Sequence, residues 1–160
     1  MLVDSHCHLD APEFDHDRDA VIQRARQAGV FQQVIPAITA DGWPRLREIC
    51  ATQAGLFPAY GLHPMFLSAH QPEHLQVLGE WITRERPLAV GECGLDFNRD
   101  SSPRPQQEKV LEEHLALAVV LQLPVFLHER VASQRLLDIL RAFRDQLPAA
   151  VVHCFTGERK

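Results

Sequence analysis

The sequence predicts an α/β fold in which parallel strands, joined by helical crossovers, curve into an incomplete (β/α) barrel. Six short strand-like runs alternate regularly with five longer amphipathic runs, a pattern typical of βαβ units. Candidate reactive side chains stand at the C-terminal ends of the strand-like runs, where barrels place their active sites. The chain has 160 residues, whereas a complete eight-unit barrel needs roughly 250. We therefore expect a single domain, residues 1–160, with about six strands and five helices.

The strands are predicted from short runs of apolar and β-branched residues bounded by turn-forming residues. In chain order they are LVDSHCH (2–8), VFQQVIPA (30–37), FPAYGL (57–62), LAVGEC (88–93), PVFLH (124–128) and AAVVHCF (149–155).

The helices are predicted from apolar residues that recur at a spacing of three or four. In chain order they span 15–28, 41–54, 72–84, 106–121 and 131–146. Gly29 and Gly55 follow the first two helices, and Asp41 is expected to cap the second. The polar run GLDFNRDSSPRP is predicted to be a loop.

An open doubly wound sheet would produce the same alternation, so the position of the reactive residues decides between the two folds. Each candidate lies at or just beyond the C-terminal end of a predicted strand. The candidates are His6, His8, His63, Glu92, His128 and His153. In an open sheet these side chains would fan out along one edge, whereas the curvature of a barrel brings them together, so a convergent set favours the barrel.

Imidazoles and a carboxylate that converge at one end of the barrel indicate a metal site, and the number of candidate ligands indicates two ions. Neutral imidazole suits Zn²⁺ or Mn²⁺ better than Mg²⁺, which prefers oxygen. A lone catalytic zinc has about three protein ligands. We assign His6 and His8 to one ion and His128 and His153 to the other, with Glu92 bridging both.

The remaining histidines and the cysteines are predicted to be structural. His16, His70, His74 and His114 have polar neighbours and are expected on the surface. The four cysteines form no CxxC pair, which argues against a zinc knuckle or a redox dithiol. Because neighbouring strand residues face opposite sides, the cysteines that adjoin a candidate ligand should face the strand–helix core. These are Cys7, Cys93 and Cys154.

Two further residues near the predicted site have alternative interpretations. Asp96 either orients a metal-bound group or caps a turn, and Arg130 either holds a substrate phosphate or is a solvated residue at a helix start.

The charge of the chain limits how it can bind a polyanion. Its net charge is −5, whereas a protein that binds nucleic acid through its surface is normally basic. Attraction for such a substrate must therefore come from bound metal ions. The N-terminus lacks the pattern of a secretory signal, and no apolar run is long enough to cross a bilayer. We expect a cytoplasmic protein with no membrane association.

The motifs SHCHLD, GLHP, VGECGLDF, LPVFLHER and VVHCFTG, in this order, resemble those of the TatD family of metal-dependent hydrolases. The resemblance implies a barrel of the amidohydrolase-like kind and metal-dependent hydrolysis of DNA phosphodiester bonds, often exonucleolytic, with single-stranded DNA the favoured substrate. It implies Glu92 as a catalytic ligand and His63 as a contact to the substrate phosphate. The implied metal positions are His6, His8, Glu92, His128 and His153.

The family continues for about one third more chain, which carries an Asp in an ETDAP-like motif, whereas this sequence ends at Lys160. That Asp is implied to be a metal ligand and the proton acceptor for the attacking water. The chain is therefore interpreted as a fragment or as a truncated product inactive alone. Self-association through exposed strand edges is expected. The alternative function is a metal-dependent amidohydrolase or esterase acting on a small substrate.

Overall fold

A computed structural model describes residues 1–158 and contains one six-stranded parallel sheet in the order β1-β2-β3-β4-β5-β6. The strands are β1 Leu2–Asp4, β2 Val30–Pro36, β3 Leu56–Tyr60, β4 Ala89–Asp96, β5 Val125–Arg130 and β6 Ala150–His153. Every neighbouring pair is parallel, because each connection returns the chain to the same end of the sheet through a helix. The expected incomplete (β/α) barrel is confirmed.

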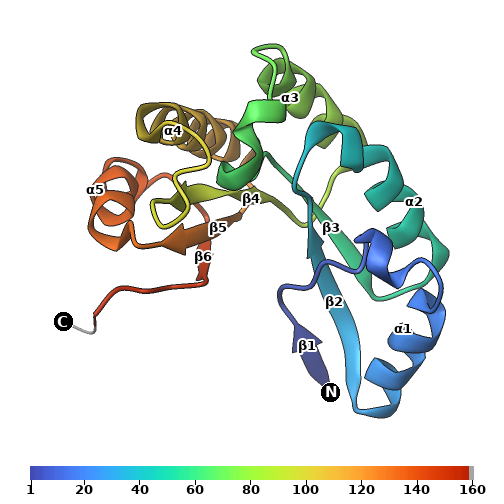
Figure 1. Cartoon of the computed structure of the whole chain (residues 1–160). Helices are drawn as coiled ribbons and strands as arrows, with labels where there is room; N and C mark the ends of the chain where they lie inside the picture. The colour runs from blue at the N-terminus through green and yellow to red at the C-terminus, as the bar shows by residue number, and fades with distance from the viewer. Residues whose placement is uncertain (159–160) are drawn as a thin grey trace.

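Five α-helices lie along the convex side of the curved sheet (Figure 1). They are α1 Arg18–Gln27, α2 Trp43–Thr52, α3 His74–Glu85, α4 Arg104–Leu121 and α5 Ser133–Phe143. Three short 3₁₀ segments precede helices: η1 Pro12–Phe14, η2 Ala40–Gly42 and η3 Pro64–Ala69. None of the helices formed by residues 1–158 is long and apolar enough to cross a membrane.

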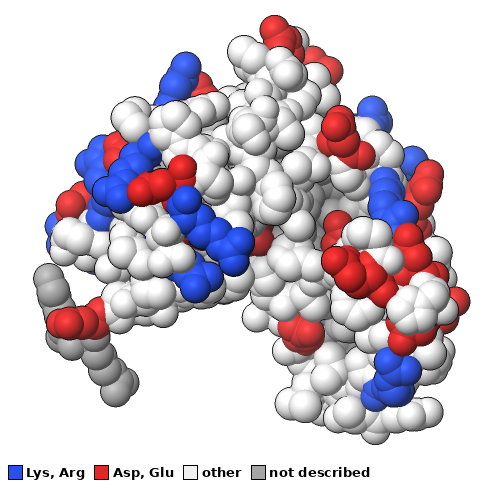
Figure 2. Space-filling model, viewed as in Figure 1, with Lys and Arg blue, Asp and Glu red and all other residues white. Residues whose placement is uncertain are grey.

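The core fills the space between the sheet and the helices. All eight residues of β4 are buried, as expected for a strand with neighbours on both sides. An aromatic group formed by Trp43, Tyr60 and Trp81, with ring centroids 5.8–6.5 Å apart, packs α2 and α3 against β3. The concave side of the sheet, in contrast, is open and appears as a hollow in the space-filling view (Figure 2).

The predicted elements are all present, with differences at their ends. β1 ends at Asp4 rather than at residue 8, although Cys7 N–H still donates to the Val34 carbonyl at 3.1 Å. β4 continues to Asp96, so the predicted loop is shorter than expected. The expected cap at Asp41 is wrong: this residue lies in η2, and the residue that precedes α2 is Gly42.

Within residues 1–158, two strands have a neighbour on one side only. β1 pairs with β2 alone, β6 pairs with β5 alone, and the two lie at opposite ends of the sheet. Apolar residues on both strands are exposed, among them Leu2, Val3 and Val151. Unpaired backbone groups beside exposed apolar side chains are templates for pairing with another chain.

We expect the chain to associate in a concentration-dependent way through these edges. Val151→Lys and Leu2→Lys should each lower the association, because a charge on an edge strand opposes edge-to-edge pairing. Val120→Lys is the matched control, since Val120 is 77% exposed but lies on α4. Light scattering over a range of protein concentrations measures the effect. A monodisperse monomer at every concentration would contradict the prediction.

Candidate metal centre

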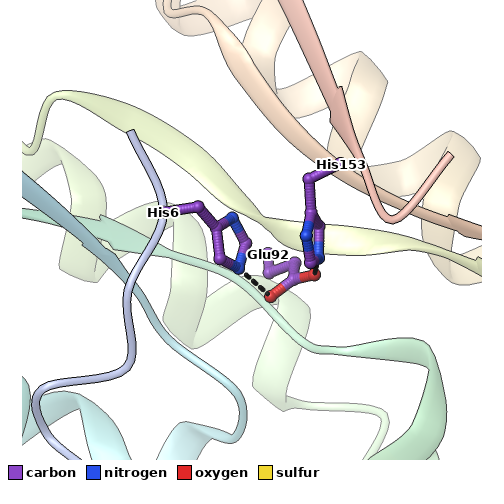
Figure 3. A group of neighbouring side chains, drawn as sticks. All are labelled: His6, Glu92 and His153. Carbon is purple, nitrogen blue, oxygen red and sulfur yellow. Dashed lines mark hydrogen bonds and ion pairs between the residues drawn. The ribbon is translucent and has the colours of Figure 1, made fainter. Parts of the chain in front are cut away.

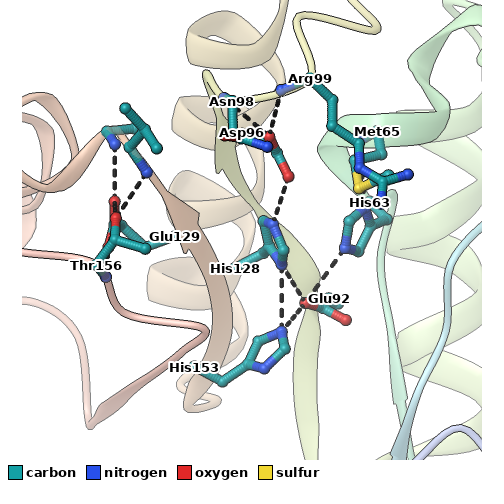
Figure 4. Close-up of polar contacts among 12 residues, drawn as sticks. His63, Met65, Glu92, Asp96, Asn98, Arg99, His128, Glu129, His153 and Thr156 are labelled. Carbon is teal, nitrogen blue, oxygen red and sulfur yellow. Dashed lines mark hydrogen bonds and ion pairs between the residues drawn. The ribbon is translucent and has the colours of Figure 1, made fainter.

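The carboxylate of Glu92 lies at the centre of the concave face and is completely buried. The pairing of β4 with β5 shifts register between Val90 and Cys93, and irregularities of this kind re-aim side chains beside functional sites. Imidazoles from both edges of the sheet converge on this carboxylate (Figures 3 and 4). The converging residues are His6 and His8 after β1, His63 before η3, His128 on β5 and His153 at the end of β6.

The two oxygens of Glu92 face different histidines. Oε2 lies 3.2 Å from His6 Nε2 and 3.5 Å from His8 Nε2. Oε1 lies 3.3 Å from His63 Nε2, 3.2 Å from His128 Nδ1 and 2.5 Å from His153 Nε2. One carboxylate therefore joins the histidines of the first strand to those of the later strands.

The histidines also contact one another, and one of these contacts joins the two ends of the sheet. His6 Nε2 lies 3.3 Å from His8 Nε2, and His128 Nδ1 lies 3.2 Å from His153 Nε2. The rings of His6 and His153 are stacked, with centroids 3.7 Å apart and planes at 21°. His6 follows β1 and His153 ends β6, and these are the first and last strands of the sheet. The site therefore joins the two edges of the sheet.

Two groups of potential ligand atoms lie within the reach of a single cation. One group consists of His6, Glu92 and His153, and the other of His63, Glu92 and His128; the atoms of each lie within 4.8 Å of one another. Glu92 Oε2, together with the Nδ1 atoms of His6 and His8, is buried without a hydrogen-bond partner. Buried polar atoms normally have partners, and an unsatisfied carboxylate oxygen among imidazole nitrogens fits a divalent cation.

The electrostatics of the site favour an ionised carboxylate. Burial opposes ionisation of Glu92, but hydrogen bonds from His128, His153, His6 and His63 outweigh it and hold its pKa well below the usual range. Burial lowers the pKa of His8, which favours the neutral imidazole that a metal needs.

Asp96 holds His128 and also caps a turn, so both interpretations of this residue describe real contacts. Its Oδ2 lies 2.9 Å from His128 Nε2, while its Oδ1 accepts hydrogen bonds from the N–H groups of Asn98 and Arg99. Gln107 on α4 fixes the strand end, because its amide bonds both the N–H and the carbonyl of Asp96. Such a contact fixes the orientation of an imidazole that could bind a metal.

The comparisons with known proteins agree with this geometry. Residues 3–160 match the model of the family described as TatD related DNase. The chain belongs to this family. A curated relative from Cronobacter turicensis, described as a 3′-5′ ssDNA/RNA exonuclease TatD, is 40% identical over 156 residues. That match covers 98% of this chain and 59% of the relative.

Solved structures share the fold. A TatD homologue from Escherichia coli k12 superposes with a TM-score of 0.92 at 37% identity, covering 98% of this chain and 61% of the other. An uncharacterized amidohydrolase from Saccharomyces cerevisiae gives a TM-score of 0.84 at 19% identity, covering 98% of this chain and 62% of the other. The second likeness shows the fold alone. This TatD-family chain thus spans about three fifths of the length of the relatives that it matches.

The six candidates predicted at strand ends come together in this TatD-family chain. Within the described part of the chain, residues 1–158, the side chain of Arg130 forms no hydrogen bond or ion pair with them. Arg130 is partly buried at the end of β5. Among residues 1–158, its guanidinium has no hydrogen-bond or ion-pair partner within the chain. Its predicted contact with a phosphate stays a prediction.

The expected surface position of His114 is wrong. This histidine is completely buried on α4, where its Nε2 accepts a hydrogen bond from Leu62 N–H at 3.1 Å and its Nδ1 donates to the Val110 carbonyl at 2.7 Å. It therefore ties α4 to the backbone just before His63. The spacing was a usable signal, because residue 114 lies three after Leu111, on the apolar face of the helix.

Sequence reasoning missed Glu129 as a structural carboxylate beside the site. Glu129 is completely buried. Its oxygens accept hydrogen bonds from Ala132 N–H at 2.7 Å and from the N–H of Thr156 at 2.6 Å, and also from the Thr156 hydroxyl. These contacts, visible in Figure 4, join the loop after β6 to the start of α5. The signal in the sequence was the spacing: residue 129 lies on the same face of the strand as Val125 and Leu127, which are buried.

The cysteines follow the expectation in two of three cases. Cys93 is completely buried in the core, and Cys7 packs against the core. Cys154 is exposed, so its expected core position is wrong. β6 ends at His153, and Cys154 has a φ of +56°, which breaks the strand alternation on which the expectation rested.

Gly94 permits the close approach of β4 to β5 that positions His128. Its φ is +142°, and a Cβ at this position would lie 2.1 Å from the His128 carbonyl oxygen. Only glycine fits such a contact without displacing the backbone that carries His128.

We expect His114 to make the stability of this chain depend on pH. Burial lowers the pKa of His114 from 6.5 to about 4. Between these values the unfolded chain binds more protons than the folded one, so the free energy of unfolding falls as the pH drops from 6.5 toward 4. The stability that depends on neutral His114 is fully present above pH 6.5, and its loss on acidification lowers the free energy of unfolding by about 3 kcal/mol at most.

Urea denaturation of wild type and His114→Gln across this pH range measures the contribution. The glutamine does not titrate, yet its side-chain oxygen can still accept a hydrogen bond from Leu62 N–H. The variant should therefore lose less stability on acidification than wild type. Equal losses in the two proteins would show that His114 does not carry this pH dependence.

Proposed function

We propose that this chain forms the metal-binding part of a nuclease that hydrolyses phosphodiester bonds of single-stranded DNA. The observation that carries the proposal is the buried carboxylate of Glu92, whose two oxygens face two separate sets of histidines. A carboxylate in this position is suited to bridge two cations. Membership of the TatD related DNase family supports the same activity.

Two divalent ions, Zn²⁺, Mn²⁺ or Mg²⁺, would be held by the histidines together with Glu92. His6 and His8, which face Oε2, would help to hold one ion, and His128 and His153, which face Oε1, the other. His153 also lies within reach of a cation held by His6 and Glu92. When bound, such ions polarise a phosphoryl oxygen and raise the acidity of water at neutral pH. Imidazole ligands favour Zn²⁺ or Mn²⁺ over Mg²⁺.

The chain itself contributes charge and orientation to this chemistry. Contacts with the surrounding histidines hold the pKa of Glu92 well below its usual range despite burial, which keeps its negative charge available to cations. Asp96 holds the ring of His128, and α4 fixes both Asp96 and the segment that precedes His63. The site is therefore organised before substrate arrives, which lowers the cost of reaching a reactive geometry.

His63 and Arg130 are proposed to contact the substrate phosphate. His63 faces the same oxygen of Glu92 as His128 does, which would place its ring beside a phosphate held at the metals. Arg130 follows His128 by two residues on β5, and its guanidinium has no partner within residues 1–158. The relative from Cronobacter turicensis, described as acting on ssDNA and RNA, supports a single-stranded substrate.

Metal binding is expected to depend on the histidines around Glu92. Isothermal titration of the chain with Zn²⁺ and Mn²⁺ should detect binding, and His128→Ala and His153→Ala should each weaken it. The expected loss exceeds the roughly 10–100-fold that removal of an outer partner usually causes. His16→Ala is the control, because this exposed histidine forms an ion pair with Asp17 just before α1 and belongs to neither group of potential ligands around Glu92. No metal binding by wild type would contradict the proposal.

Nuclease activity is expected to require Glu92. Glu92→Gln retains the size of the side chain but removes its charge, so cleavage of a labelled single-stranded oligonucleotide should slow by about 10²–10³-fold. Gel analysis of the products, with the metal-loaded protein, measures the rate. Cleavage of a nitrophenyl ester but not of the oligonucleotide would point instead to an esterase.

A further inference from the structure

Phe66 is held in a fixed relation to His63 by a short turn. The Nδ1 of His63 accepts a hydrogen bond from Met65 N–H at 3.1 Å, and its carbonyl accepts one from Phe66 N–H at 3.0 Å. Pro64 and Leu67, on either side, are buried and anchor the segment. The ring of Phe66 lies 5.7 Å from that of His63, edge to face at 67°.

Phe66 is nevertheless 43% exposed. Exposed single apolar residues are common on protein surfaces, so exposure alone indicates nothing. The position of Phe66 is informative. His63 Nε2 lies 3.3 Å from Glu92 Oε1, so the ring of Phe66 lies one side chain away from the centre of the site.

Arg99 supplies a second, independent observation at the same place. Asp96 Oδ1 accepts a hydrogen bond from Arg99 N–H at 3.0 Å, which fixes the backbone of Arg99 above the site. Its side chain points toward His63 and Met65 (Figure 4). Among residues 1–158, no carboxylate lies within 4 Å of its guanidinium.

Arg99 differs from most arginines of the described residues. Most arginines of the described residues contact a carboxylate, as Arg104 contacts Asp100 and Arg135 contacts Glu108. Basic side chains gather over α4 and α5 up to the rim of the hollow (Figure 2). A guanidinium without a partner at this rim is free to bind an anion, and its planar fork matches a phosphate.

We propose that Phe66 and Arg99 form a nucleotide subsite beside His63, in which a base stacks on the Phe66 ring and Arg99 binds a backbone phosphate. The inference rests on the proposed nuclease function and assigns to it two residues that would bind the unpaired nucleotide next to the reacting phosphate. Stacking on an aromatic ring tolerates every base, so the subsite selects single strands without selecting a sequence. A paired base must first leave its duplex to reach the ring.

The test is binding of single-stranded DNA oligonucleotides by the metal-loaded chain, followed by fluorescence anisotropy. Phosphorothioate linkages slow cleavage during the measurement. One oligonucleotide is complete, and others carry an abasic site at each of the last three positions of the 3′ end in turn. Stacking contributes roughly 1–3 kcal/mol per base, so one abasic position should weaken wild-type binding about 5- to 160-fold.

Phe66→Ala should weaken binding of the complete oligonucleotide by a similar factor and leave binding of that abasic oligonucleotide unchanged. Phe66→Trp should restore the difference in affinity between the complete and the abasic oligonucleotide, because an indole ring also stacks. Phe31→Ala is the matched control: Phe31 is 48% exposed but lies near the start of β2, at the opposite end of the sheet. It should bind as wild type does.

Arg99→Met should weaken the complete and the abasic oligonucleotides equally and reduce the salt dependence of binding, because a phosphate contact is lost. Arg86→Met is the control, since Arg86 also lacks a partner within residues 1–158 but follows α3, away from the site. It should leave both affinities unchanged.

The outcomes separate this inference from the function on which it rests. If wild type binds and cleaves single strands but Phe66→Ala weakens complete and abasic oligonucleotides alike, the stacking subsite is wrong and the nuclease proposal stands. If metal-loaded wild type binds no single-stranded oligonucleotide, both are wrong.

Discussion

One buried carboxylate organises this protein. Glu92 is completely enclosed, and removing a charge from water costs several kcal/mol unless partners compensate for it. Five histidines supply that compensation, and they come from segments that follow or belong to four different strands. The position of each strand end is therefore coupled to the others through a single side chain. The same arrangement that satisfies the carboxylate also prepares a site for cations.

The curvature of the sheet makes this convergence available. Parallel strands end at one side of the molecule, and the curved order β1 to β6 brings His6 and His153 into ring contact although their strands are not neighbours. In a flat sheet of the same order these two residues would be separated by the full width of the sheet. The site is therefore both a product of the curvature and a link between the two edges.

α4 supports the site from outside the sheet. His114 bonds the backbone of Leu62, and Gln107 bonds both backbone groups of Asp96. One helix thus fixes the segment that carries His63 and the carboxylate that holds His128. Glu129 does the same for the loop beyond β6 through Thr156. These buried polar contacts are fully paired, which is the condition under which such networks make a site rigid.

The sequence by itself determined the order and type of the elements, and it predicted the histidines and the carboxylate that the structure brings together. Alternating apolar patterns reflect which faces are buried, and strand ends are marked by local composition, so His6, Glu92 and His153 could be placed on a common rim without coordinates. The motifs further determined the family. These properties belong to short segments of the chain, so they can be predicted from the local sequence.

Tertiary structure alone decided which side chains meet and which are buried. His114 lies in a helix with polar neighbours, yet it is enclosed because Leu62 packs against that face and offers it an unpaired N–H. Cys154 is exposed because β6 stops one residue earlier. The two faces of Glu92, and the place of Phe66 beside them, depend on contacts between residues far apart in the chain. Such contacts have no counterpart in local patterns, since the energy of each pairing belongs to both partners together.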